Sequence, residues 1–254
     1  MRRPLFFITL AALVLAGASA PADPAPVHVA FVGDSMADGL WGAMFRRLGK
    51  DKCLAEKVKL IRKAKNGTGL TRLDQFNWVD EIAKIVGTDH PDLTLASFGI
   101  NDRQGIVEKD KHATPYPSPA FDTRYEAIVA DTIRAALGEG GSMLIVGLPI
   151  ILDEEANADA QAKNRIFEAA IKDIGSDKAT YAAPWTSGAS VEVYKPYLPN
   201  AKGAMTLVRA SDGIHFTTIG YDMVMEAVYP ALLVSLKTRG RDLVAECPLK
   251  AEVR

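Results

Sequence analysis

The sequence predicts an α/β fold, a three-layer α/β/α sandwich around a central parallel sheet. Short apolar runs alternate with longer helical stretches along the chain, which is the pattern of parallel strands joined by helices that cover both faces of a sheet. The strand-like runs contain few polar residues, as expected for strands buried on both faces. With 254 residues, 48% of them hydrophobic and 24% charged, the composition is that of one ordinary globular domain.

Strands and helices are expected in strict alternation. The first strand is predicted at 27–32, where the sequence VHVAFV alternates only weakly, and a helical stretch follows at about 38–48. The same succession of a short apolar run and a longer helical stretch repeats through the rest of the chain. The further strands are predicted at 58–61, 93–98, 143–148 and 179–182, and the further helices near 77–86, 123–137, 157–174 and 218–237.

Two connections are longer than the rest. One, at 102–122, is rich in charge and proline, and the other, at 184–211, carries Trp185, Tyr194 and Tyr197. Loops of this length in a compact α/β domain are more often functional than idle. The three aromatic side chains either line a sugar-binding cleft or pack onto their own domain, and the sequence favours neither.

Residues 1–22 have the three-part pattern of a secretory signal peptide: a charged start, an apolar run too short to span a bilayer comfortably, and small residues at the end. Cleavage after Ala22 is favoured over cleavage after Ala20, which would leave Pro21 beside the cut. We therefore expect a mature domain at 23–254 that is periplasmic or secreted, without stable membrane insertion after signal removal. The alternative is an uncleaved signal that anchors the chain.

Charge and cysteine content exclude several classes of function. The 30 Lys+Arg and 31 Asp+Glu give a formal net charge of -1, so no nucleic-acid partner is expected. Cys53 and Cys247 form no Cys-x-x-Cys pair, which excludes zinc ribbons and thioredoxin-like redox centres. In an oxidising compartment the two cysteines either form a disulfide or remain buried thiols, and both possibilities stay open.

Candidate functional residues follow the first two predicted strands. Ser35 lies on a turn between the first strand and a helix, where unpaired backbone N–H groups create a positive potential around its hydroxyl. Gly69 lies in a glycine-containing loop after the second strand, where a backbone N–H can approach a bound oxygen. The same sequence pattern is expected if Ser35 only caps a helix and Gly69 lies in an ordinary loop.

Two further signals complete the set. Asn101 follows the third strand, and Asp212 precedes His215 by three residues just before the last helix, a spacing that lets the carboxylate fix the tautomer of the imidazole. Each signal alone is also typical of a turn or a cap. Together they bring a hydroxyl, an N–H group, an amide and an Asp/His pair to one edge of one sheet, the edge at which α/β proteins bind ligands.

These segments resemble the four blocks of the SGNH, or GDSL-type, hydrolase superfamily. The similarity covers nearly the whole mature chain and implies a flavodoxin-like sandwich with the chemistry of an ester hydrolase. Met36 stands where the name-giving leucine usually lies, and Gly67 competes with Gly69 for the second block. The sequences GINDRQ and DGIHFT are similar to an exported bacterial subfamily of unestablished substrate. The four blocks are Gly33-Asp34-Ser35, Gly69, Gly99-x-Asn101-Asp102 and Asp212-x-x-His215.

The resemblance and the residue chemistry together imply acyl transfer. Ser35 would be the nucleophile, His215 the general base and Asp212 the group that orients the imidazole. The oxyanion hole would consist of the backbone N–H groups of Ser35 and Gly69 and the side-chain amide of Asn101. No cofactor and no metal are expected, since the four histidines show no zinc-ligand spacing.

Asp34 and Asp102 are expected to be structural acceptors of backbone N–H groups. Arg72 and Arg103, next to two of the proposed oxyanion blocks, either contact an anionic substrate or face solvent.

The expected function is that of a serine-dependent acyl-ester hydrolase acting outside the cytoplasm, an O-acetyl or short-chain esterase on a glycan or on small esters. The first alternative is an O-acyltransferase that uses the same serine and passes the acyl group to a cell-envelope glycan. The second is a non-catalytic carbohydrate-binding protein of the same fold, because a fold does not determine a function.

Overall fold

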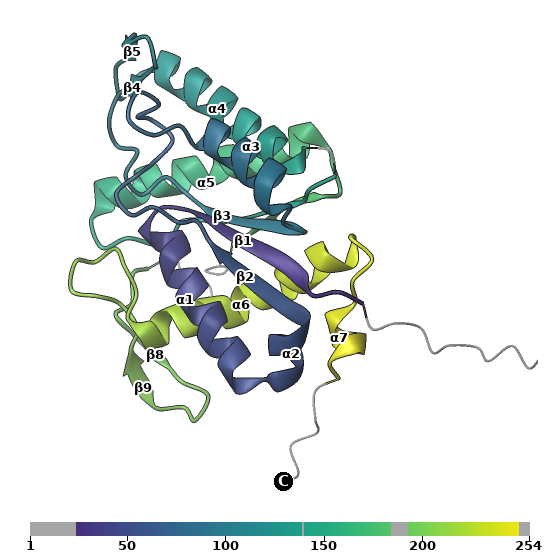
Figure 1. Cartoon of the computed structure of the whole chain (residues 1–254). Coiled ribbons are helices and arrows are strands. Elements are labelled where there is room, and N and C mark those ends of the chain that lie inside the picture. Colours follow the sequence, from purple (N-terminus) through teal and green to yellow (C-terminus); the bar gives the residue numbers. More distant parts are fainter. Residues whose placement is uncertain (1–23, 139, 184–192, 249–254) are drawn as a thin grey trace, which may run out of the picture.

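A five-stranded parallel sheet forms the middle layer of the molecule (Figure 1), with strand order β2-β1-β3-β6-β7. The computed structural model describes residues 24–138, 140–183 and 193–248. The predicted signal peptide and Trp185 lie outside the described residues. The strands of the sheet are β1 (Val27–Gly33), β2 (Val58–Arg62), β3 (Leu93–Ser97), β6 (Met143–Val146) and β7 (Ala179–Ala182).

The central strand β1 shows why these apolar runs become buried strands. Its side chains alternate between two hydrophobic clusters, with Val29 and Phe31 in one and Ala30 and Val32 in the other. Both faces of β1 are therefore covered by hydrophobic side chains. The sequence predicts this, because polar and apolar residues alternate only weakly along the strand. The strand pairs with β2 on one side and β3 on the other, all in parallel.

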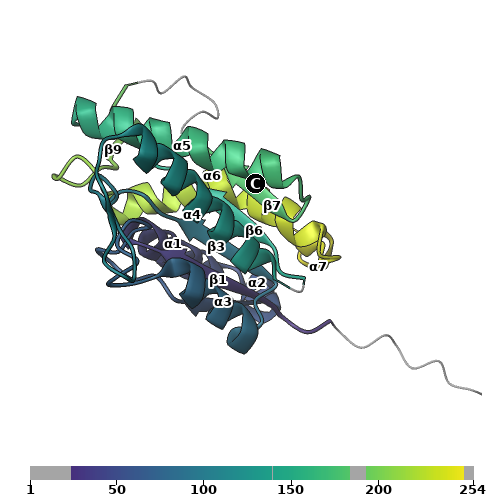
Figure 2. The same cartoon turned by 90° about the horizontal axis from the view of Figure 1, so that it is seen from above.

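Helices cover both faces of the sheet, as Figures 1 and 2 show. The long helices α1 (Ser35–Lys50) and α6 (Thr218–Lys237) pack against one face, together with the short helices α2 (Lys52–Lys57) and α7 (Leu243–Glu246). The opposite face is covered by α3 (Trp78–Asp89), α4 (Pro119–Leu137) and α5 (Glu154–Ile174). The predicted three-layer sandwich is confirmed.

Three of the helices begin about one turn earlier than their apolar periodicity predicts. In each case a polar side chain just before the helix accepts a backbone N–H of the first turn, which stabilises the helix from that point. These capping residues are Asp34 for α1, Ser118 for α4 and Asp153 for α5.

The short elements were not predicted. Inside the connection at 102–122, β4 (Ile106–Val107) and β5 (Ala113–Thr114) form a two-stranded hairpin, and in the described part of the second long connection β8 (Tyr197–Pro199) and β9 (Met205–Leu207) form another. The helices α2 and α7 are joined by a disulfide between Cys53 and Cys247, whose Cα atoms are 5.7 Å apart. The structure thus selects the disulfide from the two open possibilities.

Among the described residues, α6 is the one helix long and apolar enough to cross a membrane by length and composition. In the structure it packs against α1, β6 and β7, and Val228, Leu232 and Leu236 on it are fully buried. Its apolar composition is therefore accounted for by its place in the core.

Candidate active site

The candidate residues come from loops at the carboxyl ends of the strands. Ser35 is the first residue of α1, directly after β1, and the Asn101 loop follows β3. The sheet order changes direction between these two strands, because β2 lies on one side of β1 and β3 on the other. Such a switch point leaves a crevice in which α/β proteins bind ligands.

Ser35, His215 and Asp212 form a continuous hydrogen-bonded chain. The Ser35 Oγ lies 2.6 Å from His215 Nε2, and His215 Nδ1 lies 2.7 Å from Asp212 Oδ2. With the ring proton on Nδ1, the imidazole donates a hydrogen bond to Asp212 and accepts a hydrogen bond from the Ser35 hydroxyl. The structure therefore brings together residues 180 positions apart in the arrangement of a nucleophile, a base and an orienting carboxylate.

Asp212 is held in its charged form by this arrangement. Burial by itself raises its pKa, but hydrogen bonds from the His215 ring and from the backbone N–H groups of Ile214 and His215 outweigh this effect and lower the pKa to about 2. A carboxylate that remains ionised stabilises the imidazolium that forms when His215 takes up a proton.

The segment that carries His215 is fixed by Arg209, which the sequence did not point to. This arginine is 5% exposed, and its guanidinium donates to the carbonyl oxygens of Ile150 and Ile214 at 2.7 Å each. It also lies over the ring of Phe216, 4.3 Å from the ring centroid. Arg209 thus anchors both neighbours of His215.

Asp34 lies under the nucleophile and caps its helix. The side chain is fully buried, and its Oδ1 accepts the Met36 N–H at 2.8 Å. Within the described part of the chain its Oδ2 has no hydrogen-bond partner. Burial, opposed by the Met36 hydrogen bond, raises the pKa of Asp34 to about 8, so this carboxyl group keeps its proton at neutral pH.

Asp102 joins the second and third blocks. Its buried carboxylate accepts the Leu70 N–H at 2.9 Å, the Thr71 hydroxyl at 3.0 Å and the Tyr125 hydroxyl at 2.9 Å. Gly69 packs so closely on it that a Cβ at this position would lie 1.9 Å from Asp102 Oδ1. Glycine is therefore required at position 69, which supports it over Gly67 as the residue of the second block.

Asn101 is tied to the same loop. Its Nδ2 donates to the Thr68 carbonyl at 2.7 Å, which uses one of its two N–H groups and leaves the other for an oxygen of a ligand. The expectation that Asp34 and Asp102 are structural acceptors agrees with their contacts. Tyr125, in the middle of α4, belongs to this assembly but has no signal in the sequence.

The remaining candidates from the sequence are engaged elsewhere. Arg72 forms a two-pronged ion pair with Asp74 at 2.9 and 3.0 Å, and Arg103 pairs with Glu155 at 3.0 Å. Tyr194 lies under the guanidinium of Arg209, 4.7 Å from it, and so packs onto its own domain. Tyr197 is half exposed on the β8–β9 hairpin.

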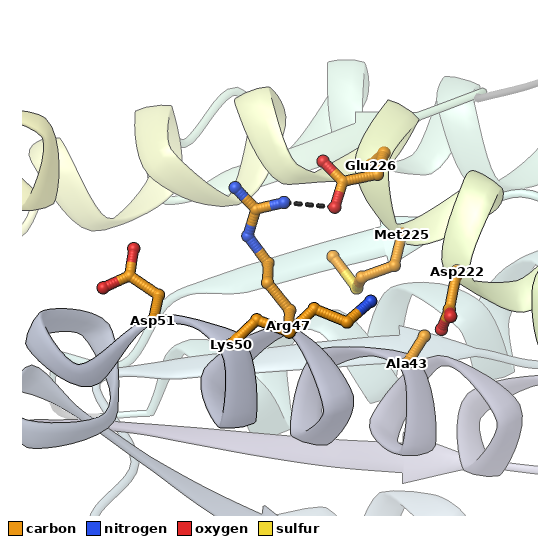
Figure 3. Close-up of a pocket in the computed structure, with 7 residues that line it drawn as sticks. All are labelled: Ala43, Arg47, Lys50, Asp51, Asp222, Met225 and Glu226. Atoms are coloured by element: carbon orange, nitrogen blue, oxygen red, sulfur yellow. Dashed lines mark hydrogen bonds and ion pairs between the residues drawn. The ribbon is translucent and has the colours of Figure 1, made fainter. Parts of the chain in front are cut away.

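A hollow between the second half of α1 and α6 lies apart from this site (Figure 3). Its walls carry Arg47, which pairs with Glu226, together with Lys50, Asp51 and Asp222. None of its lining residues carries a hydroxyl, a thiol or an imidazole. The Ser35 hydroxyl and the His215 imidazole lie instead at the carboxyl edge of the sheet.

Residues 28–231 match the family described as "Protein of unknown function (DUF459)". No curated protein matches the chain. The matched segment begins in β1 and ends in α6, so it contains every residue of the candidate site.

Solved structures of the same fold include esterases. A catalytic mutant of Axe2, an acetylxylan esterase from Geobacillus stearothermophilus, is 15% identical with a TM-score of 0.55, covering 81% of this chain and 94% of that one. A carbohydrate esterase family 3 structure from Talaromyces cellulolyticus is 14% identical with a TM-score of 0.56, covering 84% and 99%. A lipolytic G-D-S-L family protein from Veillonella parvula is 14% identical with a TM-score of 0.53, covering 80% and 97%. The predicted resemblance to SGNH hydrolases is thereby confirmed at the level of the fold.

Proposed function

The chain belongs to the DUF459 family, and we propose that it is a serine-dependent carboxylic ester hydrolase that acts outside the cytoplasm on O-acetyl or short-chain esters of glycans or small alcohols. The observation that carries this proposal is the chain of contacts from Ser35 Oγ to His215 Nε2 at 2.6 Å and from His215 Nδ1 to Asp212 Oδ2 at 2.7 Å. It lies at the edge of the sheet where α/β proteins bind ligands.

In the first half of the reaction, Ser35 Oγ attacks the ester carbonyl carbon and its proton moves to His215 Nε2. The carbonyl oxygen becomes negatively charged and is stabilised by the N–H groups of Ser35 and Gly69 and the free N–H of Asn101. The tetrahedral intermediate collapses when His215 returns the proton to the leaving alkoxide. An alcohol leaves, and the acyl group remains on Ser35.

In the second half, a water molecule gives its proton to His215 and attacks the acyl carbon. Collapse of the second intermediate releases the carboxylic acid and returns the proton to Ser35 Oγ. Asp212 remains ionised throughout and stabilises the imidazolium that is present in both halves.

The cellular location and the substrate class rest on separate support. Residues 1–22 have the pattern of a secretory signal, and a disulfide between Cys53 and Cys247 fits an oxidising compartment. Two of the solved structures of the same fold are named as an acetylxylan esterase and a carbohydrate esterase.

Hydrolysis of 4-nitrophenyl esters of increasing acyl length tests the proposal. Acetyl and short-chain esters should be hydrolysed, and Ser35→Ala should lower turnover by at least about 10⁴-fold. Ser176→Ala, at the opposite end of the sheet, is the matched control and should keep wild-type turnover. Circular dichroism verifies that both variants are folded. Ester hydrolysis that survives the loss of the Ser35 hydroxyl would rule out the mechanism.

A further inference from the structure

A groove of about 360 Å³ opens directly beside Ser35, between α1 and the beginning of α6. Its lining includes Trp41 and Arg46 of α1, Arg62 at the end of β2, and Phe216 and Tyr221. This volume lies within the range of small-molecule sites, roughly 300 to 1,000 Å³. No step of the mechanism above uses these side chains.

The position of the groove relative to His215 decides which part of an ester it receives. His215 must pass a proton to the leaving oxygen, so the alcohol lies on the His215 side of the reacting carbon. The proposed oxyanion donors Gly69 and Asn101 define another side of the reacting carbon, and neither residue lines the groove. Phe216 and Thr218, which follow His215 in the chain, do line it. The groove is therefore placed for the alcohol part of the substrate.

The groove presents hydrogen-bond donors in fixed orientations. Arg62 donates through Nε and Nη2 to the two oxygens of Asp38 at 2.7 and 2.9 Å, and its guanidinium lies 4.6 Å from the centroid of the Trp41 ring. Arg46 donates through Nε to Asp222 at 2.8 Å and through Nη2 to the Thr218 carbonyl at 3.3 Å. In both arginines these contacts leave the Nη1 group available to a ligand.

Each arginine of the groove has a carboxylate partner. Arg62 pairs with Asp38, which also lines the groove, and Arg46 pairs with Asp222, which lies outside it. An anionic alcohol would gain little binding energy from these arginines, since each guanidinium already has a carboxylate partner. A long aliphatic alcohol would have to remove water from Asp38, Arg46 and Arg62 without replacing its hydrogen bonds.

We propose that this groove binds the alcohol part of the ester and that this alcohol is neutral and rich in hydroxyl groups, as in a sugar. Hydroxyl groups accept from the arginine N–H groups and donate to the Asp38 carboxylate. Arg46 and Arg62 are then specificity-determining residues. This inference rests on the proposed function, because it names the substrate class of the same site.

The first test narrows the groove. Gly42, on α1, lines the groove, and a Cβ there would lie 3.2 Å from Arg46 Nη1, the N–H group that the proposal leaves to the sugar. Gly42→Leu therefore narrows the groove while improving helix propensity. Gly49→Leu is the matched control: it lies on the same helix, outside the groove, with nothing within 4 Å of its added Cβ. Circular dichroism and melting temperature verify the fold of both.

Four acetyl esters that differ only in the alcohol are compared: an O-acetyl methyl glucoside, an O-acetyl glucuronate, decyl acetate and 4-nitrophenyl acetate. The wild type should prefer the neutral sugar ester over the glucuronate and decyl esters. In Gly42→Leu the ratio of kcat/KM for the sugar ester to kcat/KM for the nitrophenyl ester should fall about tenfold, mainly through KM. Gly49→Leu should keep the wild-type ratio.

A charge-balanced variant tests the arginine directly. Arg62→Gln combined with Asp38→Asn leaves the net charge of the groove unchanged but removes the Arg62 cation, and it should lower the same ratio by about threefold or more. A ratio that is unchanged in both groove variants, or a wild type that prefers the glucuronate or decyl ester, overturns the inference while nitrophenyl ester hydrolysis still supports the proposed function. Loss of all ester hydrolysis in the wild type would instead overturn the proposed function itself.

Discussion

The two ends of the parallel sheet are held together by different chemistry. At the carboxyl ends of the strands, hydrogen bonds to the buried side chains of Asp34 and Asp102 hold the start of α1, the Leu70 loop and Tyr125 of α4. At the amino ends, the disulfide between Cys53 and Cys247 joins α2 to α7, and Arg241 forms an ion pair with Glu246 and donates to the Ala25 carbonyl just before β1. Figure 1 shows α2 and α7 side by side at the latter end.

The contacts at the carboxyl ends of the strands position the reactive groups, whereas those at the amino ends stabilise the folded chain. The carboxyl end keeps buried acids, one of them with an unpartnered oxygen, and such groups lower stability. The amino end has a covalent link that closes most of the chain into a loop. Substitutions at the two ends should therefore change different quantities.

Removing the disulfide gives the largest expected effect, and it should be on stability alone. The linked cysteines are 194 positions apart, for which loop-closure entropy predicts a loss of about 5 kcal/mol in the free energy of unfolding. The double variant Cys53→Ser/Cys247→Ser should show this loss in urea denaturation, with ester turnover unchanged while the protein is folded. A fall in turnover of the folded variant would show that the two ends are coupled.

Asn101→Ala should give the opposite result at the carboxyl end. Losing one oxyanion donor raises the barrier by about 2.7 to 4 kcal/mol, so kcat should fall by about 10²-fold or more. The hydrogen bond to the Thr68 carbonyl contributes only about 1 kcal/mol to stability, so the melting temperature should change little. Asn200→Ala, at the turn between β8 and β9, is a control that should leave kcat unaltered. An unaltered kcat in Asn101→Ala would exclude this amide from the oxyanion hole.

Asp34 gives the smallest of the three effects and tests whether the carboxyl end is destabilised by its buried acids. Its pKa is about 8 in the folded protein, against an ordinary value of 3.8, so the folded state holds a proton that the unfolded state has lost between these two pH values. The stabilisation is complete below the ordinary pKa and is lost as the pH rises through 8. From about pH 5 to about pH 9 the wild type should lose roughly 2 to 4 kcal/mol more than Asp34→Asn. Parallel pH profiles of the two proteins would mean that Asp34 is already ionised at pH 5.

The sheet and the residues of the site were accessible from sequence for the same reason. Buried strands are continuous apolar runs, and Ser35, Gly69, Asn101 and His215 each lie at a fixed offset from a strand or helix end. The order of these signals along the chain therefore predicted their convergence, because parallel strands end at one edge of the sheet.

The contacts that hold the site together were not accessible. Tyr125 lies in the middle of α4 and Arg209 in a long connection, and neither has a spacing that marks it as part of the site. Their roles depend on tertiary packing around Asp102 and His215. The short helices α2 and α7 have too few residues to show a helical period, so the proximity of Cys53 and Cys247 was left open.

Covalent labelling with a fluorophosphonate probe tests the central claim most directly, because the probe reacts with a serine hydroxyl activated by a neighbouring base. Intact-mass spectrometry of the wild type should show one adduct, which peptide mapping should place on Ser35, and His215→Ala should label far more slowly. No adduct on the folded wild-type protein, or an adduct on a residue other than Ser35, would contradict the account.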